Sequence, residues 1–203
     1  MLTTLVLRSS RALTLKNSVS CAASWSAFMP VAGATEATVG PTRGTVGDST
    51  AAWTHHQLMP DQRDWISRLP LTQQLDSALF VHASANDPQL WRYVYDTRAA
   101  KDSLDAAATT WPGVRYVFGG HVHLQTLYYQ GAGRTLMPFV PQPGVTIPVP
   151  RHRQWLATVG SAGQPRDGNT DAMYSLFDMA QAQLTFHRVP YDHFAAAAAI
   201  RRV

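Results

Sequence analysis

The chain has 203 residues, of which 45% are hydrophobic and 15% are charged, a composition that is typical of a globular protein and excludes a disordered chain. Its formal net charge is +4, and residues 1–35 contribute three of these charges through Arg8, Arg11 and Lys16, with no acidic residue. The other residues hold 17 − 3 = 14 basic and 13 acidic side chains. The positive charge therefore belongs to the amino-terminal segment, and nucleic acid is not an expected partner.

Cys21 is the only cysteine, so an intrachain disulfide and a zinc-finger pattern are both excluded. This cysteine usage suits a reducing compartment, and we expect a cytoplasmic protein. No apolar run approaches the roughly 20 residues that a transmembrane helix needs, so a membrane is not an expected partner.

Residues 1–49 are predicted to form an irregular leader, and residues 50–203 the folded domain. The leader is rich in Ser, Thr, Ala and Gly and shows no sustained period of 2 or 3.6. A signal or transit peptide is one interpretation, because residues 19–34 are weakly apolar and end in a small-residue sequence. A flexible extension is a second. The interpretation that we favour is the remnant or mistranslated start of a longer domain.

The predicted elements of the domain begin with two helices. The first is capped by Ser49 or Thr50 and runs through Leu58, and Pro60 opens the second. After them, strands are expected over 75–82, 114–118, 126–129, 135–139, 154–159, 174–178 and 183–189, with a helix over 89–108 and a proline-rich loop over 141–150. Two of these strands are continuous apolar runs, as in sheets covered on both faces. The order predicts an α/β layered fold.

Three of the eight histidines follow predicted strands. His82 closes the strand LDSALFVH, and His121 and His123 follow VRYVF after Gly119 and Gly120. Residues i and i+2 of an extended backbone point to the same side, so we expect both of the later imidazoles to face one place, beyond the strand ends where α/β sheets bind ligands. Imidazole ligands suit Zn, Fe, Mn or Ni and exclude an all-oxygen calcium site. The alternative is a surface turn.

Four segments together resemble the calcineurin-like metallophosphoesterases, in the order in which that superfamily has them. FVHASANDPQLWRYV resembles a strand that ends in Val-His before an Asp-Pro helix start, and FGGHVHLQTLYY resembles the Gly-His-x-His motif. VGSAGQPRDGNTDAMYSLFD and LTFHRVPYD resemble the loop and the final strand that follow. The resemblance spans residues 50–203 and implies a layered fold of mixed β-sheets flanked by helices.

The resemblance also implies a pair of divalent metal ions (Mn, Fe, Zn or Ni) that hydrolyse phosphate esters. By the motifs, His82 and His121 would bind one metal ion and His123 the other. Arg166 would contact the phosphate, because its planar fork matches phosphate oxygens. The alternative for Arg166 is an ion pair with Asp167 or Asp171. Asp87 is expected to cap a helix, and solvent exposure is expected for the histidines outside the motifs, which are His55, His56, His152, His187 and His193.

The amino-terminal motifs of this superfamily are absent from the sequence. The chain has no early Asp-x-His, no Gly-Asp-x-x-Asp and no Gly-Asn-His-Asp or Gly-Asn-His-Glu. Gly33-Ala34-Thr35-Glu36 lies where the last of these belongs and is interpreted as its degraded counterpart, whereas Gly47-Asp48 lies too close to His82 to replace the second. We therefore expect a fold that is incomplete at its amino terminus and lacks the carboxylate that bridges two metal ions.

Two functions follow from this pattern. The first is metal-dependent hydrolysis of phosphate mono- or diesters, impaired unless a partner or the true amino terminus supplies the missing ligands. The second is a non-catalytic remnant that binds a metal ion or a phosphorylated ligand. The expected partner is a phosphate-ester small molecule or a phosphoprotein. The oligomeric state and the catalytic residues stay open at this stage.

Overall fold

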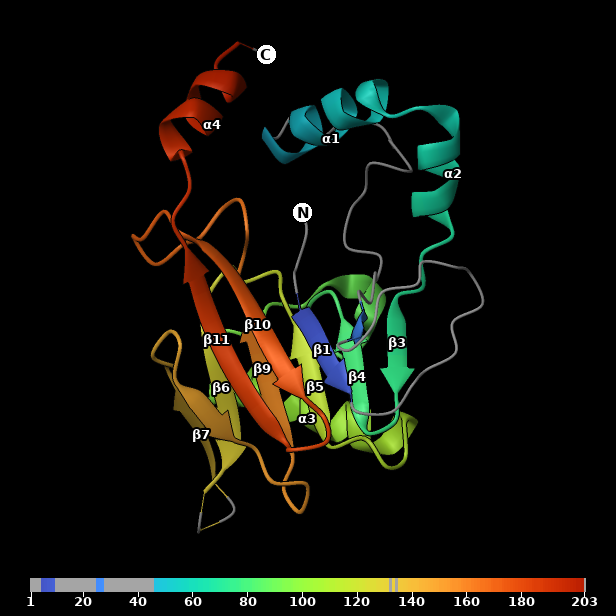
Figure 1. Cartoon of the computed structure of the whole chain (residues 1–203). Helices are drawn as coiled ribbons and strands as arrows, with labels where there is room; N and C mark the ends of the chain where they lie inside the picture. The colour runs from blue at the N-terminus through green and yellow to red at the C-terminus, as the bar shows by residue number, and fades with distance from the viewer. Residues whose placement is uncertain (1–4, 10–24, 28–45, 132, 134, 203) are drawn as a thin grey trace.

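A computed structural model describes residues 5–9, 25–27, 46–131, 133 and 135–202, with side chains from residue 52 onward. Its centre is a pair of stacked β-sheets (Figure 1). The layered α/β fold expected from the sequence is confirmed. Gly33–Glu36, the interpreted remnant of a motif, lies outside the described residues.

The six-stranded sheet has the order β3-β4-β5-β9-β6-β7. Its strands β4, β5 and β9 are parallel, whereas β3, β6 and β7 pair antiparallel with their neighbours. Every residue of β4, β5 and β9 is buried, as predicted for strands covered on both faces. The bounds are Thr72–Leu75 for β3, Ala78–Val81 for β4, Tyr116–Gly119 for β5, Gln125–Gln130 for β6, Leu136–Phe139 for β7 and Trp155–Val159 for β9.

The five-stranded sheet has the order β2-β1-β10-β11-β8. The long hairpin of β10 and β11 forms its centre, and β1 lies parallel to β10. The bounds are Leu5–Ser9 for β1, Trp25–Ala27 for β2, Thr146–Pro148 for β8, Ala172–Asp178 for β10 and Gln183–Val189 for β11. The side chains of β10 alternate strictly between fully and partly buried, as expected for a strand with one face on the core.

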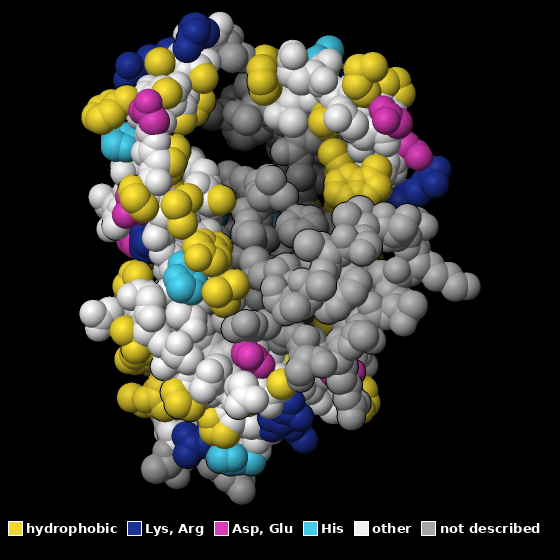
Figure 2. All heavy atoms as spheres, in the orientation of Figure 1, with side chains coloured by type: hydrophobic (Ala, Val, Ile, Leu, Met, Phe, Trp, Pro, Cys, Tyr) yellow, Lys and Arg dark blue, Asp and Glu magenta, His cyan; other side chains and the backbone are white. Residues whose placement is uncertain are grey.

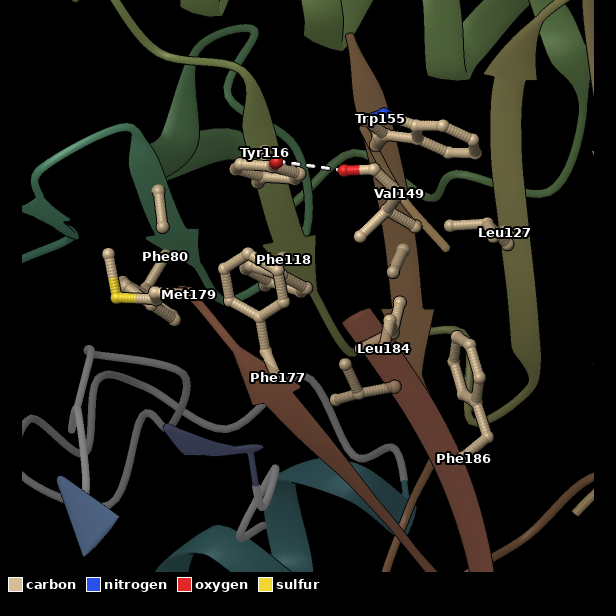
Figure 3. Close-up of a cluster of buried hydrophobic side chains, with 13 residues drawn as sticks. Phe80, Tyr116, Phe118, Leu127, Val149, Trp155, Phe177, Met179, Leu184 and Phe186 are labelled. Carbon is tan, nitrogen blue, oxygen red and sulfur yellow. Dashed lines mark hydrogen bonds between the residues drawn. The ribbon is translucent and has the colours of Figure 1, made fainter. Parts of the chain in front are cut away.

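The hydrophobic core lies between the two sheets (Figure 3). Phe177 of β10 is fully buried and packs against Tyr116 and Phe118 of β5, with ring centroids 4.6 and 5.0 Å apart. The hydroxyl of Tyr116 donates a hydrogen bond of 2.8 Å to the backbone carbonyl of Val149, which satisfies the polar atom inside the core.

A second cluster lies on the other face of the six-stranded sheet, beneath helix α3 (Thr97–Thr110). Ala100, Leu104 and Ala107 recur at helical spacing and face that sheet. The carboxylate of Asp96 caps the helix by accepting a hydrogen bond from the Ala99 N–H. The order of layers is therefore helix, six-stranded sheet, five-stranded sheet.

Three further helices lie away from the sheets at one end of the molecule (Figure 1). They are α1 (Val46–Gln57), α2 (Pro60–Ser67) and α4 (His193–Ile200). Figure 2 shows hydrophobic side chains on their surfaces, and Lys and Arg in several separate places on this face of the molecule. Among the described helices, none is long and apolar enough to cross a membrane.

The structure corrects several predicted elements. The helix expected over 89–108 is a 3-10 turn at Pro88–Leu90, a non-helical segment and then α3. The strand expected over 75–82 is the β3–β4 hairpin, which turns at Asp76 in the left-handed region. The proline-rich loop over 141–150 contains β8, and α1 begins at Val46, before the expected caps.

Part of the predicted irregular leader is ordered. Residues 5–9 form β1, which pairs in parallel register with β10, and residues 25–27 form β2 beside it. These two short segments of the expected leader are therefore strands of the five-stranded sheet. The division of the chain at residue 50 into a leader and a domain stays a prediction.

Candidate functional site

The three motif histidines follow two neighbouring parallel strands. His82 comes directly after β4, and His121 and His123 come just after β5. Phe80 of β4 lies in register with Phe118 of β5, so the carboxyl ends of both strands lie at one edge of the sheet. Such an edge is where α/β proteins bind ligands.

The two loops approach each other because β5 ends in glycine. A Cβ on Gly119 would lie 2.6 Å from the carbonyl oxygen of Ala83, so no side chain fits there. The next N–H, that of Gly120, donates a hydrogen bond of 2.8 Å to the carbonyl of His82. The close approach holds the start of the GGHVH segment against the residues that follow β4.

His82 and His121 meet directly. Nε2 of His82 lies 2.9 Å from Nδ1 of His121, with the rings nearly edge-on. Burial lowers the pKa of His82 to about 4, with further contributions from the charges of His121 and His123. Burial also lowers the pKa of His121, assisted by His123 and Arg166. Both imidazoles are therefore neutral at pH 7, the form that binds a metal ion.

This spacing fits two ligands of one metal ion. Nitrogens bound at ~2.0–2.1 Å to a tetrahedral zinc ion are ~3.3 Å apart. The 2.9 Å between His82 Nε2 and His121 Nδ1 needs to open by only a few tenths of an ångström to admit an ion. The motif likewise implies that His82 and His121 bind the same metal ion, and this assignment stays a prediction.

His123 lies near them but points elsewhere. Its Nδ1 is 2.7 Å from the carbonyl oxygen of Gln164, and its own carbonyl accepts a hydrogen bond from the Arg166 N–H. His121 and His123 both have φ of 61°, in the left-handed region. The extended backbone predicted for this pair is therefore wrong, and the i, i+2 argument does not hold. Non-glycine residues in this strained region, here separated only by Val122, cluster at functional sites.

Arg166 has neither of the ion pairs that the alternative interpretation gave it. Asp167 pairs instead with Arg188, and no ion pair of Arg166 with Asp171 is present among the described residues. The Arg166 guanidinium is exposed and reaches only the hydroxyl of Tyr95, at 3.5 Å. Because its charge is not neutralised there, it is available to an anion.

An aromatic segment after β4 covers the histidines, and the sequence analysis missed it. Trp91 lies 5.3 Å from the ring of His82, and Tyr93 lies 4.1 Å from that of His121. Tyr95 stacks on Tyr93 at 5.1 Å. The indole Nε1 of Trp91 is buried and has no hydrogen-bond partner within the described part of the chain. The aromatic residues at alternate positions, W-R-Y-V-Y, do not follow helical spacing and are the sequence signal for this non-helical segment.

Comparison with known proteins finds a solved structure and a curated protein that are similar to this chain. The chain is 27% identical to a structure described as a metallophosphoesterase from Sphaerobacter thermophilus, with a TM-score of 0.69 over 82% of this chain and 67% of that one. It is 26% identical over 144 residues to an uncharacterized protein of Methanocaldococcus jannaschii. The match covers 69% of this chain and about half, 54%, of the archaeal protein. No protein-family profile matches the chain.

The similarity to a metallophosphoesterase structure supports the calcineurin-like metallophosphoesterase superfamily that the motifs resemble. The described part of the chain offers few side chains that could bind a metal ion. No three or more His, Cys, Asp or Glu side chains in the described ranges converge closely enough to hold a metal ion. His82 and His121 thus fit two positions around an ion, and the described residues add no carboxylate to them.

The remaining predicted side chains lie outside this histidine cluster. Asp87 occupies the cap position of the 3-10 turn, but its carboxylate makes no capping hydrogen bond and pairs with Arg92 at 3.2 Å. His56 and His152 are exposed, as expected, whereas the exposure expected for His187 is wrong. Its Nε2 is buried, and its ring stacks on Tyr174 at 4.6 Å.

Proposed function

We propose that this chain hydrolyses phosphate mono- or diesters with the help of a divalent metal ion. The observation that carries the proposal is the 2.9 Å contact between His82 Nε2 and His121 Nδ1, at the strand ends of a metallophosphoesterase fold. The buried imidazole of His82 and the partly buried one of His121 both have lowered pKa values and favour a bound cation, because each keeps a lone pair at neutral pH.

Each side chain then has a role. His82 and His121 would hold a metal ion, and His123 would bind through Nε2, because its Nδ1 is hydrogen-bonded to the Gln164 carbonyl. When bound, such an ion polarises a phosphoryl oxygen and lowers the pKa of water. Arg166 would orient the ester through its guanidinium, which no described carboxylate neutralises.

A second candidate function is binding without turnover. It rests on the finding that the described residues bring no group of three or more metal-binding side chains together. A site of two imidazoles and one guanidinium is able to hold a metal ion or a phosphorylated ligand, but it lacks a carboxylate to position a second ion.

One experiment separates the two candidates. The purified chain is analysed for bound metal, and hydrolysis of 4-nitrophenyl phosphate and bis(4-nitrophenyl) phosphate is measured with Mn²⁺. The same measurements are made on His121→Ala, on His82→Ala and on the control His152→Ala, whose imidazole is exposed and outside the site. Thermal unfolding of each variant shows that it is folded.

Hydrolysis and metal content that His121→Ala and His82→Ala abolish, and that His152→Ala leaves unchanged, are the expected results. Metal binding without turnover in the parent chain supports the binding function instead. Equal metal content in all four proteins would overturn both candidates, because the two histidines would then hold no ion.

A further inference from the structure

We propose that the cavity beside the histidine cluster binds a sugar-like, polyhydroxylated group, so that the preferred ligands are sugar phosphates. This inference rests on the proposed function, because it assigns the organic part of the ester whose phosphate group lies at the histidines. The cavity has a volume of about 400 Å³, which is within the range of small-ligand sites.

The cavity and the histidine cluster share their walls. Ser84 and Asn86 line the cavity and follow His82 by two and four residues. Tyr93 lines it as well, and its ring lies 4.1 Å from that of His121. An ester held at the histidines therefore has the cavity next to it, with Tyr93 between the two.

The position of these walls is fixed by hydrogen bonds. The Oγ of Ser103, on α3, accepts a hydrogen bond of 2.9 Å from the Ala85 N–H, and both residues are buried. The Oγ of Ser84 accepts another from the Asn86 N–H at 3.1 Å. The loop after His82 is thus held against the first turns of α3, which form the other side of the cavity.

The charges that line the cavity balance. Two guanidinium groups and two carboxylates face it, so the lining has a formal charge of 2 − 2 = 0 and is not built for a second phosphate. A guanidinium only donates hydrogen bonds and a carboxylate only accepts them, whereas a hydroxyl does both. Adjacent hydroxyls of a sugar satisfy such a mixed set. The four residues are Arg92, Arg98, Asp96 and Asp102.

Two of these charged groups are available to a ligand. Arg92 is paired with Asp87, and Asp96 caps α3. The side chains of Arg98 and Asp102, one turn apart on the exposed surface of α3, form no hydrogen bond or ion pair with any described residue. A flat base would need apolar faces on both sides, but only Tyr93 and Ala99 in the lining are apolar.

The test compares three phosphate esters by titration calorimetry and ligand-observed NMR: glucose 6-phosphate, ribose 5-phosphate and butyl phosphate. The chain is expected to bind the two sugar phosphates about tenfold more tightly than butyl phosphate, since hydrogen bonds to charged groups are strong. Arg98→Ala and Asp102→Asn should each reduce this preference to about threefold or less. Asp105→Asn, on the same helix and paired with Lys101, is the control and should keep the preference.

Each outcome of this comparison either supports or contradicts a sugar-binding cavity. Equal binding of all three esters, or an unchanged preference in both variants, overturns the sugar site. An equal loss for all three esters in Arg98→Ala would show an anion site instead, and no binding of any ester also overturns the inference. Because the test compares binding affinities alone, its result does not depend on whether the chain hydrolyses the esters. Hydrolysis of 4-nitrophenyl phosphate without any sugar preference leaves the proposed function intact.

Discussion

Gln164 and His123 are joined by a hydrogen bond of 2.7 Å between a backbone carbonyl and an imidazole nitrogen. A carbonyl oxygen only accepts, so Nδ1 of His123 carries the proton and Nε2 holds the lone pair. Metal-binding histidines commonly donate their second N–H in this way. The loop after β9 therefore sets which nitrogen of His123 is presented at the sheet edge.

The tautomer of His123 is directly measurable. Long-range ¹H–¹⁵N NMR spectra at pH 7.5 are expected to show Nδ1 of His123 as the protonated nitrogen and Nε2 as the unprotonated one. Burial and the charge of Arg166 both lower the pKa of this imidazole, so it is neutral under these conditions. The exposed His152, outside the site, serves as the reference. A protonated Nε2 on His123 would contradict the assignment.

The close approach at Gly119 predicts a site-specific effect of a single methyl group. Gly119→Ala places a Cβ 2.6 Å from the Ala83 carbonyl, a backbone atom that cannot move independently. We expect a loss of about 2 kcal/mol in the free energy of unfolding, together with weaker metal binding, as the two loops separate. Chemical denaturation and metal titration measure both effects.

The matched control is Gly163→Ala, in the loop after β9. A Cβ there meets no atom within 4 Å, so we expect a change within about 0.5 kcal/mol. If both substitutions destabilise the protein equally, the contact with Ala83 is not the cause.

The buried strands and the motif histidines were the most predictable features of this chain. An apolar run such as that of β4 predicts a strand covered on both faces, and β11 has the predicted bounds, Gln183–Val189. Histidines that follow such strands are brought to the same sheet edge by parallel pairing alone. For this reason the proximity of His82 and His121 could be predicted from the sequence.

Local backbone geometry was less predictable. His121 and His123 adopt the left-handed conformation beside the close approach of Gly119 to Ala83, a contact between residues 36 positions apart that no local pattern predicts. The ion pair of Asp167 with Arg188 also joins residues that are distant in the sequence. It shows that Asp167 does not pair with Arg166, its neighbour in the sequence. Helical propensity over 89–108 favoured one helix, whereas residues 91–95 are not helical and Trp91 and Tyr93 of this stretch pack on the imidazoles.

The Asp167–Arg188 pair predicts a stability that depends on pH. Burial raises the pKa of the Asp167 carboxyl, but hydrogen bonds from Arg188 and the Asn169 N–H outweigh it, and the pKa is lowered overall. A lowered pKa in the folded state stabilises the protein above the unfolded pKa of about 3.9, and this contribution is lost as the pH falls through the folded value. Asp167→Asn should therefore cost about 1 kcal/mol at pH 7.

Urea denaturation at pH 7 and at pH 3 measures this difference. The gap between the parent chain and Asp167→Asn is expected to narrow at pH 3, where the parent carboxylate gains a proton. Asp171→Asn is the control, because no ion pair of Asp171 is present among the described residues. A gap of the same size at both pH values would show that the charge of Asp167 does not stabilise the fold.

The packing of Phe177 between the sheets predicts the largest effect on stability. Its ring is fully buried and lies against Tyr116 and Phe118 across the sandwich (Figure 3), so Phe177→Ala leaves a cavity where the two sheets meet. We expect a loss of about 3–5 kcal/mol in the free energy of unfolding, measured by chemical denaturation. Phe194→Ala removes an equal side chain from α4 that is 77% exposed, and its effect should stay within about 0.5 kcal/mol. Equal stability of the two variants would contradict a role of this cluster in joining the sheets, because Phe177 belongs to the cluster and Phe194 does not.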